Sequence, residues 1–354
     1  MRILITGICG FVGSTIALRL REVVPDAEIF GFDNLIRPGS ERNRPRLAEA
    51  GIAMRHADMR HASDMDALPA ADWVIDAAAN PSVLAGVDGR TSSRQLVDHN
   101  LAGTVNLLEF CKARRTGFIL LSTSRIYSIK PLAEMKVAVE GNGFRPDFSA
   151  SARPGLSGAG ISEEFSTTPP LSLYGCTKLA SELLALEYGD TFDFPVWINL
   201  CGVLAGAGQF GRADQGIFSF WINSWLRRRP LQYIGFDGRG RQVRDCLHPR
   251  DLVPLLQKQM ATPTALHRVC NVSGGIKNSI SLAQLSRWCA ERFGPMEVGS
   301  DSQPRPFDVP WMVLDSRRAE VEWDWKVETP LPDIFAEIAD HAERHPDWLE
   351  ISNP

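Results

Sequence analysis

Short apolar runs alternate with longer stretches of helical periodicity along the first third of the chain. Four runs have the length and composition of buried strands: residues 1–6, 28–32, 72–76 and 117–122. Between them, apolar side chains recur at helical spacing over 11–22 and over 92–115. Repeated strand–helix units predict an α/β fold with a doubly wound parallel sheet, because parallel strands need crossover connections.

Length and local composition set the expected domain organisation. With 354 residues the chain is long for one hydrophobic core. We expect the sheet domain to span 1–200, with returning segments around 240–270, and a smaller C-terminal α/β domain to take up most of 201–354. The stretch 141–164 is rich in Gly, Ser and Pro, and it predicts a long surface loop that serves as a lid or binding element.

Overall composition is that of an ordinary globular protein. Apolar residues make up 44% and charged residues 23%, and the net charge of −4 with a pI near 6.0 favours neither nucleic acid nor a membrane as partner. The seven cysteines and seven histidines show no metal-ligand spacing, so no metal site is indicated and the thiols are expected to be reduced. A strand that begins at residue 2 leaves no room for a signal peptide, and no apolar run approaches the ~20 residues of a membrane span. We expect a cytoplasmic protein.

A glycine-rich turn follows the first predicted strand. Gly7, Gly10 and Gly13 would permit a tight turn, close approach of the backbone to a pyrophosphate, and packing of helix on strand. The helix from Phe11 and Val12 onward would point its amides at the phosphates. Turn glycines are common, but with a strand before and a helix after, this triplet predicts a dinucleotide site.

The second predicted strand ends on an acid that selects the dinucleotide. Asp33 lies 26 residues after Gly7, where its carboxylate would accept hydrogen bonds from the adenosine ribose. The same charge would repel a 2′-phosphate. The expected cofactor is therefore NAD rather than NADP.

Candidate catalytic groups follow in the middle of the chain. Tyr174 and Lys178 are spaced i, i+4 on a predicted helix that runs to about Tyr188, and Thr123 ends the strand over 117–122. We expect Lys178, next to a positively charged nicotinamide, to lower the pKa of the phenol from ~10 toward neutrality. Tyr174 can then take a proton from a substrate hydroxyl while hydride leaves for the nicotinamide. A Tyr and a Lys on a solvated helix face are ordinary, and it is their place downstream of the dinucleotide motif that favours catalysis.

Taken together, these motifs resemble the extended short-chain dehydrogenase/reductase superfamily of nucleotide-sugar enzymes. The likeness rests on the glycine motif, Asp33–Asn34, Asp58, the Ala77–Ala79 turn, 100–106, Ser122–Thr123, Tyr174–Lys178, 242–251, 271–282 and 305–325. It implies a Rossmann-type domain, a nucleotide-sugar substrate and a homodimer or higher homo-oligomer.

The resemblance also assigns roles to individual residues. The expected catalytic residues are Thr123, Tyr174 and Lys178. Contacts with NAD fall to Gly7, Gly10, Phe11, Val12, Gly13, Asp33, Asn34, Arg37, Asp58, Met59, Ala77, Ala78, Ala79, Asn100, Ser122, Tyr174 and Lys178. Contacts with the substrate fall to Pro81, Thr123, Ser124, Gln209, Gln215, Tyr233, Arg244 and Arg305.

Within the superfamily the chain is most similar to the branch of CDP-paratose (CDP-tyvelose) 2-epimerases. The segments 33–40, 160–163, 174–178 and 209–216 carry this likeness, the element Asp214-Gln215-Gly216 above all. The chain departs from the branch at Leu200, where Arg is expected. The likeness implies epimerisation of a CDP-linked sugar, with C2 the expected centre.

The sequence excludes one alternative activity of this superfamily and leaves two others open. A 4,6-dehydratase needs an acid and a base after its Thr, whereas Ser124 and Arg125 follow Thr123 and cannot supply them. A net oxidoreductase that releases reduced cofactor could use the same catalytic set, and a non-catalytic NAD sensor would not need it. Among the substrate positions, Arg244 could instead pair with a neighbouring acid, and Tyr233 could simply pack in a core.

Overall fold

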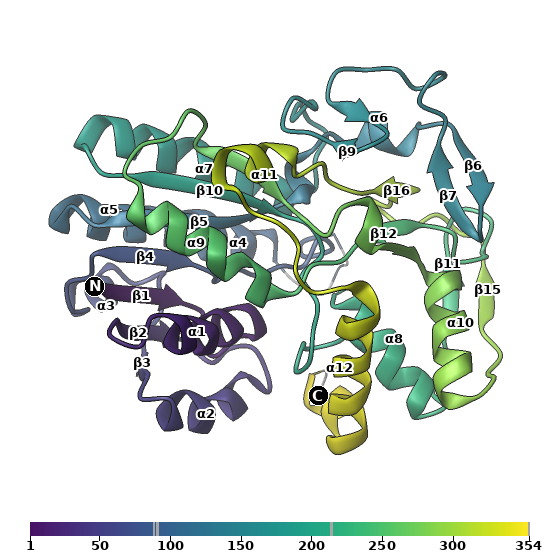
Figure 1. The fold of residues 1–354 in the computed structure, drawn as a ribbon, viewed down its shortest axis with the longest axis horizontal. Coiled ribbons are helices and arrows are strands. Elements are labelled where there is room, and N and C mark those ends of the chain that lie inside the picture. Colours follow the sequence, from purple (N-terminus) through teal and green to yellow (C-terminus); the bar gives the residue numbers. More distant parts are fainter. Residues whose placement is uncertain (88, 90–91, 213–214, 353–354) are drawn as a thin grey trace.

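The computed structural model describes residues 1–87, 89, 92–212 and 215–352. At its centre is a seven-stranded sheet in which every paired neighbour runs parallel, as Figure 1 shows. In spatial order the strands are β13 (Val269–Val272), β10 (Val196–Cys201), β5 (Gly117–Thr123), β4 (Trp73–Asp76), β1 (Arg2–Thr6), β2 (Glu28–Asp33) and β3 (Ala53–His56). The predicted doubly wound parallel sheet is confirmed.

Helices cover both faces of this sheet because its strands are apolar on both sides. Along β1, Leu4 belongs to one hydrophobic core while Ile3 and Ile5 belong to the other, as the two-residue period of a strand requires. The first core is closed by α3 (Ala62–Asp66), α5 (Gly103–Arg114), α6 (Ile129–Ala133) and α7 (Leu173–Phe192). The second is closed by α1 (Phe11–Val23), α2 (Arg44–Glu49), α9 (Leu252–Ala261) and α11 (Arg317–Trp323).

The predicted helix over 92–115 exists but is not uniform. It starts as α4 (Ser93–Leu96), widens into the π-helical turn η2 (Val97–Ala102), and continues as α5. Such widened turns occur often at functional sites. Here the widened turn contains Asn100, which is buried and faces the loop after β4.

The predicted surface loop over 141–164 is wrong in part. Two antiparallel hairpins occupy this region, β6 (Val137–Glu140) with β7 (Gly143–Pro146), and β8 (Leu156–Ser157) with β9 (Gly160–Ile161). They are held by distant segments, since the Phe144 amide donates to the Arg241 carbonyl and the Ile161 amide to the Val313 carbonyl. Long-range pairing of this kind leaves no local periodicity in the sequence.

A second unit packs beside the carboxyl ends of the central strands (Figure 1). Its helices are α8 (Ile217–Leu226), α10 (Leu282–Phe293), α12 (Leu331–Arg344) and α13 (Trp348–Ser352). Its strands are β11 (Gln232–Ile234) with β15 (Gly299–Asp301), and β14 (Ser279–Ser281) with β12 (Val243–Asp245) and β16 (Trp311–Met312). Three elements that lie between these in the sequence, α9, β13 and α11, belong to the large sheet or pack on it. The chain therefore crosses between the two units more than once.

Short 3-10 turns connect several of these elements. They are η1 (Ser40–Asn43), η3 (Ser124–Ile126), η4 (Pro249–Asp251) and η5 (Ile276–Asn278). Within the described residues, no helix is long and apolar enough to cross a membrane.

Candidate active site

The glycine turn has the geometry of a phosphate-binding loop. Gly7 has a φ of 59°, which favours glycine, and its carbonyl accepts from the Gly10 amide at 2.8 Å. A Cβ on Gly13 would lie 2.3 Å from the Gly7 oxygen, so a side chain there would push α1 away from β1. The amides at the start of α1 are thereby held open for an anion. The loop fits the pyrophosphate of NAD.

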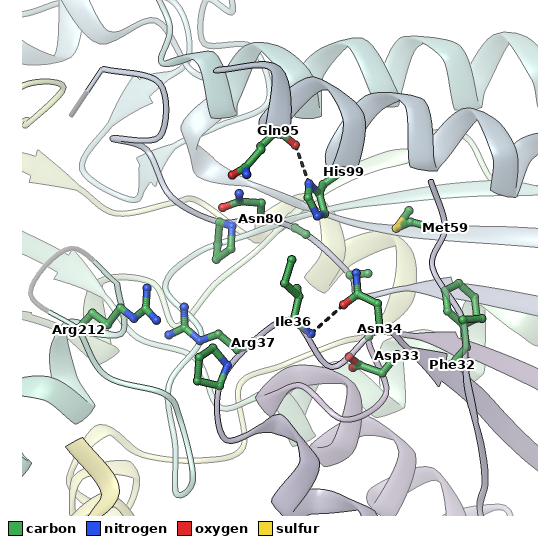
Figure 2. Close-up of a pocket in the computed structure, with 16 residues that line it drawn as sticks. Phe32, Asp33, Asn34, Ile36, Arg37, Met59, Asn80, Gln95, His99 and Arg212 are labelled. Carbon is green, nitrogen blue, oxygen red and sulfur yellow. Dashed lines mark hydrogen bonds between the residues drawn. The ribbon is translucent and has the colours of Figure 1, made fainter. Parts of the chain in front are cut away.

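A cavity of about 220 Å³ lies next to this loop (Figure 2). Eight of its lining residues were predicted as ligand contacts: Gly7, Asp33, Asn34, Arg37, Met59, Ala78, Ala79 and Pro81, of which Pro81 was assigned to the substrate. Eight others were missed: Phe32, Ile36, Pro38, Ala57, Asn80, Gln95, His99 and Arg212. Gly10, Phe11, Val12, Gly13, Asp58, Ala77, Asn100, Ser122, Tyr174 and Lys178 do not line it.

The acid at the end of β2 faces the cavity with both oxygens already in use. Asp33 accepts from the Cys9 amide at 3.0 Å and from the Leu35 amide at 2.8 Å, and burial raises the pKa of its carboxyl. Each carboxylate oxygen has a second lone pair, so Asp33 can still accept from a ribose hydroxyl. Asp33 therefore both shapes the loop and presents an acceptor to the ligand.

Asp58 lies behind the cavity. Arg60 donates two hydrogen bonds to Asp58 and holds the pKa of that carboxyl well below its usual range. The Asn34 amide group donates to Asp58 at 3.0 Å. Asp58 therefore orients Asn34, which does line the cavity.

Two arginines reach the outer end of the cavity, where Figure 2 shows their guanidinium groups side by side. Arg37 donates to the Gln215 side chain at 2.8 Å, and Arg212 donates to the Ser352 carbonyl at 2.8 Å. Gln215, predicted to bind substrate, is thus tied to a residue of the dinucleotide cavity. Asp214, the other distinctive residue of that element, lies outside the described residues.

Asn100 braces the floor of the same cavity from behind. Its side chain accepts from the Asn80 amide at 2.8 Å and donates to the Asn80 carbonyl at 3.0 Å. It also reaches the Thr177 hydroxyl on α7 at 3.3 Å. Asn100 therefore fixes the loop that lines the cavity, and its predicted contact with NAD stays a prediction.

The predicted catalytic pair is assembled where β5 ends and α7 begins. The Ser172 hydroxyl caps α7 by accepting from the Gly175 amide at 3.0 Å, which places Tyr174 in the first turn. The Tyr174 phenol is hydrogen-bonded to Thr123. Tyr174 belongs to a small buried cluster with Ala85 and Leu96, and Val83 from the loop after β4 packs against that cluster.

The expected lowering of the Tyr174 pKa, by Lys178 together with the charged nicotinamide, stays a prediction. Burial raises the pKa of the phenol to about 12, opposed by the hydrogen bond from Thr123 and by the charge of Arg125. Asp76 and Glu182 are buried near the Lys178 ammonium and favour its charged form, whereas burial lowers its pKa.

The two buried acids near Lys178, Asp76 and Glu182, each accept a hydrogen bond from a strand hydroxyl. The Ser122 hydroxyl donates to Glu182, and the Thr6 hydroxyl donates to Asp76 at 2.6 Å. Burial raises the pKa of Glu182 to about 7 and lowers that of Lys178. Lys178 itself makes no hydrogen bond or ion pair within the described part of the chain, so its donors are available to a ligand.

A second cavity, of about 390 Å³, lies between the catalytic strand ends and the second unit. Arg244 and Arg305 line it, as predicted for substrate contacts. Arg244 pairs with Asp308 at 2.7 Å rather than with Asp245 or Asp251. Arg125 also lines the cavity and was missed as a binding residue, because its only sequence signal was the absence of an acid.

The remaining predicted substrate residues lie around this cavity rather than in its wall. Tyr233 stacks on Trp221 with ring centroids 5.5 Å apart, and Trp221 is the ring that lines the cavity. Thr123, Ser124, Gln209 and Gln215 are not among its lining residues. Gln209 instead donates to the Leu204 carbonyl at 2.6 Å.

Leu200, the departure noted in the sequence, lies in the interior. It is 1% exposed on β10 and packs in the core beneath α7. An arginine at this position would need a buried partner for its charge. The leucine therefore suits its surroundings.

Comparison with known proteins agrees with this geometry. The NAD dependent epimerase/dehydratase family matches residues 3–273. The chain belongs to this family. Its cofactor is accordingly NAD, and its fold class and the enzymatic nature predicted from the motifs are confirmed.

Individual relatives narrow the chemistry to nucleotide sugars. CDP-paratose 2-epimerase of Salmonella typhi is 26% identical, covering 96% of this chain and 98% of the relative. UDP-glucuronate 4-epimerase 1 of Arabidopsis thaliana is 28% identical, over 71% of this chain and 53% of the relative. Among solved structures, UDP-glucuronic acid 4-epimerase of Bacillus cereus has a TM-score of 0.77 at 23% identity, covering 97% and 99% of the two chains.

Proposed function

We propose that the protein is an NAD-dependent epimerase that inverts C2 of a CDP-linked sugar by transient oxidation to a ketone. The observation that carries the proposal is the Tyr174–Thr123 pair with no acid beside it. Ser124 and Arg125 follow Thr123, and neither can protonate a leaving hydroxyl near neutral pH. The similarity to CDP-paratose 2-epimerase along 96% of the chain supports the base and the carbon.

In this proposal, the catalytic residues act on one sugar hydroxyl. The Thr123 hydroxyl and the Tyr174 phenol hold its oxygen, and Tyr174 removes its proton. Bound NAD would supply the hydride acceptor and donor for the oxidation and its reversal. When the ketone is reduced, Tyr174 returns the proton to the oxygen.

Other residues fix the two ligands relative to this pair. Lys178, with its donors available, would hold the ribose next to the nicotinamide. Arg244 and Arg305 would contact the diphosphate from the wall of the second cavity, since guanidinium groups suit phosphate oxygens. The sugar would then lie between these arginines and Tyr174, at the inner end of the cavity.

An epimerase returns the hydride it takes, which makes the reaction testable without knowledge of the natural sugar. The purified protein should interconvert C2-epimeric CDP-hexoses, followed by chromatography, without lasting absorbance from NADH. In D₂O the inverted carbon should gain no deuterium. A parallel assay with UDP-linked sugars tests the choice of base.

Two results would overturn the proposal in different ways. Stoichiometric accumulation of NADH would identify a net oxidoreductase. Deuterium at the inverted carbon would show deprotonation beside a carbonyl rather than hydride transfer. Faster turnover of UDP-linked sugars would correct the nucleotide and leave the reaction class intact.

A further inference from the structure

A third cavity, of about 570 Å³, lies where the helices of the large sheet meet the second unit. Part of its wall comes from α1, η1 and α2, and part comes from α12 and α13. Among the described residues, it shares no lining residue with the dinucleotide cavity or with the cavity that contains Arg244 and Arg305. Helix α1 contributes residues from Thr15 onward, so the glycine loop and the first amides of α1 lie outside it. The cavity is therefore separate from both ligand sites described above.

The wall of this third cavity is strongly basic. Three histidines and two glutamates line it together with five arginines, which are Arg19, Arg42, Arg46, Arg250 and Arg344. With the histidines neutral, five positive charges against two negative ones leave the wall at +3, whereas the whole chain carries −4. A cavity that concentrates positive charge on an acidic protein attracts anions.

Three of the five arginines already have a carboxylate partner. The pairs are Arg19–Glu22 at 2.7 Å, Arg250–Glu337, and Arg42–Asp347 at 3.3 Å, with Asp347 outside the wall. The other two, Arg46 on α2 and Arg344 on α12, have no carboxylate within ion-pair distance among the described residues. Arg344 donates to the Asp340 carbonyl at 3.1 Å. Both side chains are exposed, so two cations from different units can turn toward a ligand in one cavity.

Two of the histidines lie close to these unpaired arginines. His341 and His345 are one helical turn apart, with ring centroids separated by 4.3 Å. Burial lowers the pKa of His341 to about 4, and the positive charges of His345, Arg344 and Arg46 act in the same direction. An anion among these groups would favour protonated His341 instead. The two imidazoles therefore report on ligands from within the wall.

We propose that this cavity is a second anion-binding site, which takes an oligophosphate, either free or as the phosphate chain of a nucleotide. Guanidinium groups bind phosphate oxygens through paired N–H donors. Several phosphates in a row carry enough charge to pair with Arg46 and Arg344 together. The volume of about 570 Å³ also lies within the range of small-molecule sites, roughly 300–1,000 Å³. A bound oligophosphate would join α2 to α12 and so tie the two units together.

Proton NMR of the seven histidines tests this site directly in the NAD-loaded protein. His341→Gln and His345→Gln assign the two resonances from the wall. Sodium tripolyphosphate, added at physiological salt, should shift both resonances along one saturable curve and raise the pKa of His341. His99, which lines the dinucleotide cavity, should not shift, since bound NAD keeps tripolyphosphate out of that cavity.

Substitution of the two unpaired arginines tests the wall itself. Arg46→Gln and Arg344→Gln should each weaken tripolyphosphate binding by about tenfold, because each removes a charge-assisted contact. Both variants should bind NAD with wild-type affinity, which shows that they are folded. Arg44→Gln is the matched control, since it removes the same charge from α2 at an exposed position outside the wall. Its affinity for tripolyphosphate should equal that of wild type.

Magnesium-free ATP distinguishes the two sources of the phosphate chain. Tighter binding of ATP than of tripolyphosphate assigns the site to a nucleotide, and ATP binding that is no tighter assigns it to a free oligophosphate. Unshifted His341 and His345 at millimolar tripolyphosphate overturn the proposal. An equal loss of affinity in Arg44→Gln and Arg46→Gln also overturns it, because it would show general attraction by surface charge. None of these readouts depends on turnover, so they stand whether or not the protein is the proposed epimerase.

Discussion

The Tyr174 hydroxyl is the atom on which the proposed chemistry depends. Tyr174→Phe keeps the ring in its buried cluster with Ala85 and Leu96, and it deletes only the proton acceptor. Turnover should fall by roughly 10²–10⁴-fold, the usual contribution of a general base, while NAD still binds. Steady-state assays with calorimetric titration of NAD measure both quantities. Loss of NAD binding would show that the variant disturbs the fold rather than the proton transfer.

Glu182 gives the protein a stability that depends on pH. Burial raises its pKa from 4.5 to about 7, so the folded state binds this proton more tightly than the unfolded chain does. The stability from protonated Glu182 is complete below the unfolded pKa and is lost as pH rises through 7. Gln at this position cannot ionise. The free energy of unfolding of Glu182→Gln, relative to that of wild type, should therefore increase by about 3 kcal/mol between pH 5 and pH 8.

Urea denaturation at the two pH values checks this expectation. The exposed Glu164 offers a matched control, since Glu164→Gln should follow wild type at both pH values. An equal difference between Glu182→Gln and wild type at pH 5 and pH 8 would show that Glu182 stays ionised in the folded protein, which would return it to the role of a counter-ion for Lys178.

At the scale of elements, Asn100 couples a helix to the cofactor loop. Its hydrogen bonds satisfy both backbone groups of Asn80, and Asn80 lines the dinucleotide cavity. Asn100→Ala would leave those groups without partners and should destabilise the fold by roughly 2–4 kcal/mol and weaken NAD binding. Ser92→Ala, which removes only the cap of α4, should cost about 1 kcal/mol and leave NAD affinity unchanged. Equal NAD affinity in both variants would contradict the coupling.

Elements with local signals could be predicted from the sequence, and elements made by distant contacts could not. The run 1–6 became β1, and Gly7, Gly10 and Gly13 form the predicted turn, because adjacent residues decide both. The β8–β9 hairpin depends on a hydrogen bond from Ile161 to Val313, more than a hundred positions away. The buried neighbours of Lys178 were hidden for the same reason, since Asp76 ends β4 and lies far from Lys178 in the sequence.

The same limit applies to the whole molecule and its two cavities. Asp33 and Asn34 were predictable in the dinucleotide cavity because they follow a recognisable strand. His99 and Arg212 come from segments 66 and 179 positions further on than Asp33, and only the assembled fold brings them to the same wall. Sequence motifs therefore predict candidate reacting groups, whereas the folded chain determines the residues that line the cavities.

Assembly is the property of the whole molecule that the sequence predicted by resemblance alone. Apolar side chains on adjoining helices favour it: Val97 on η2 is 45% exposed, and Leu173 and Leu183 on α7 are 43% and 62% exposed. If these helices form the interface, burying Leu183 would contribute about 1.5–3 kcal/mol per subunit, and Leu183→Glu would place a charge there instead. The variant should shift the mass measured by light scattering toward the monomer. Val321→Glu, at a site 83% exposed on α11, which covers the opposite face of the sheet from α7, should keep the wild-type mass. A wild-type mass equal to one chain would contradict the predicted homo-oligomer, and an unchanged assembly in Leu183→Glu would place the interface on another face.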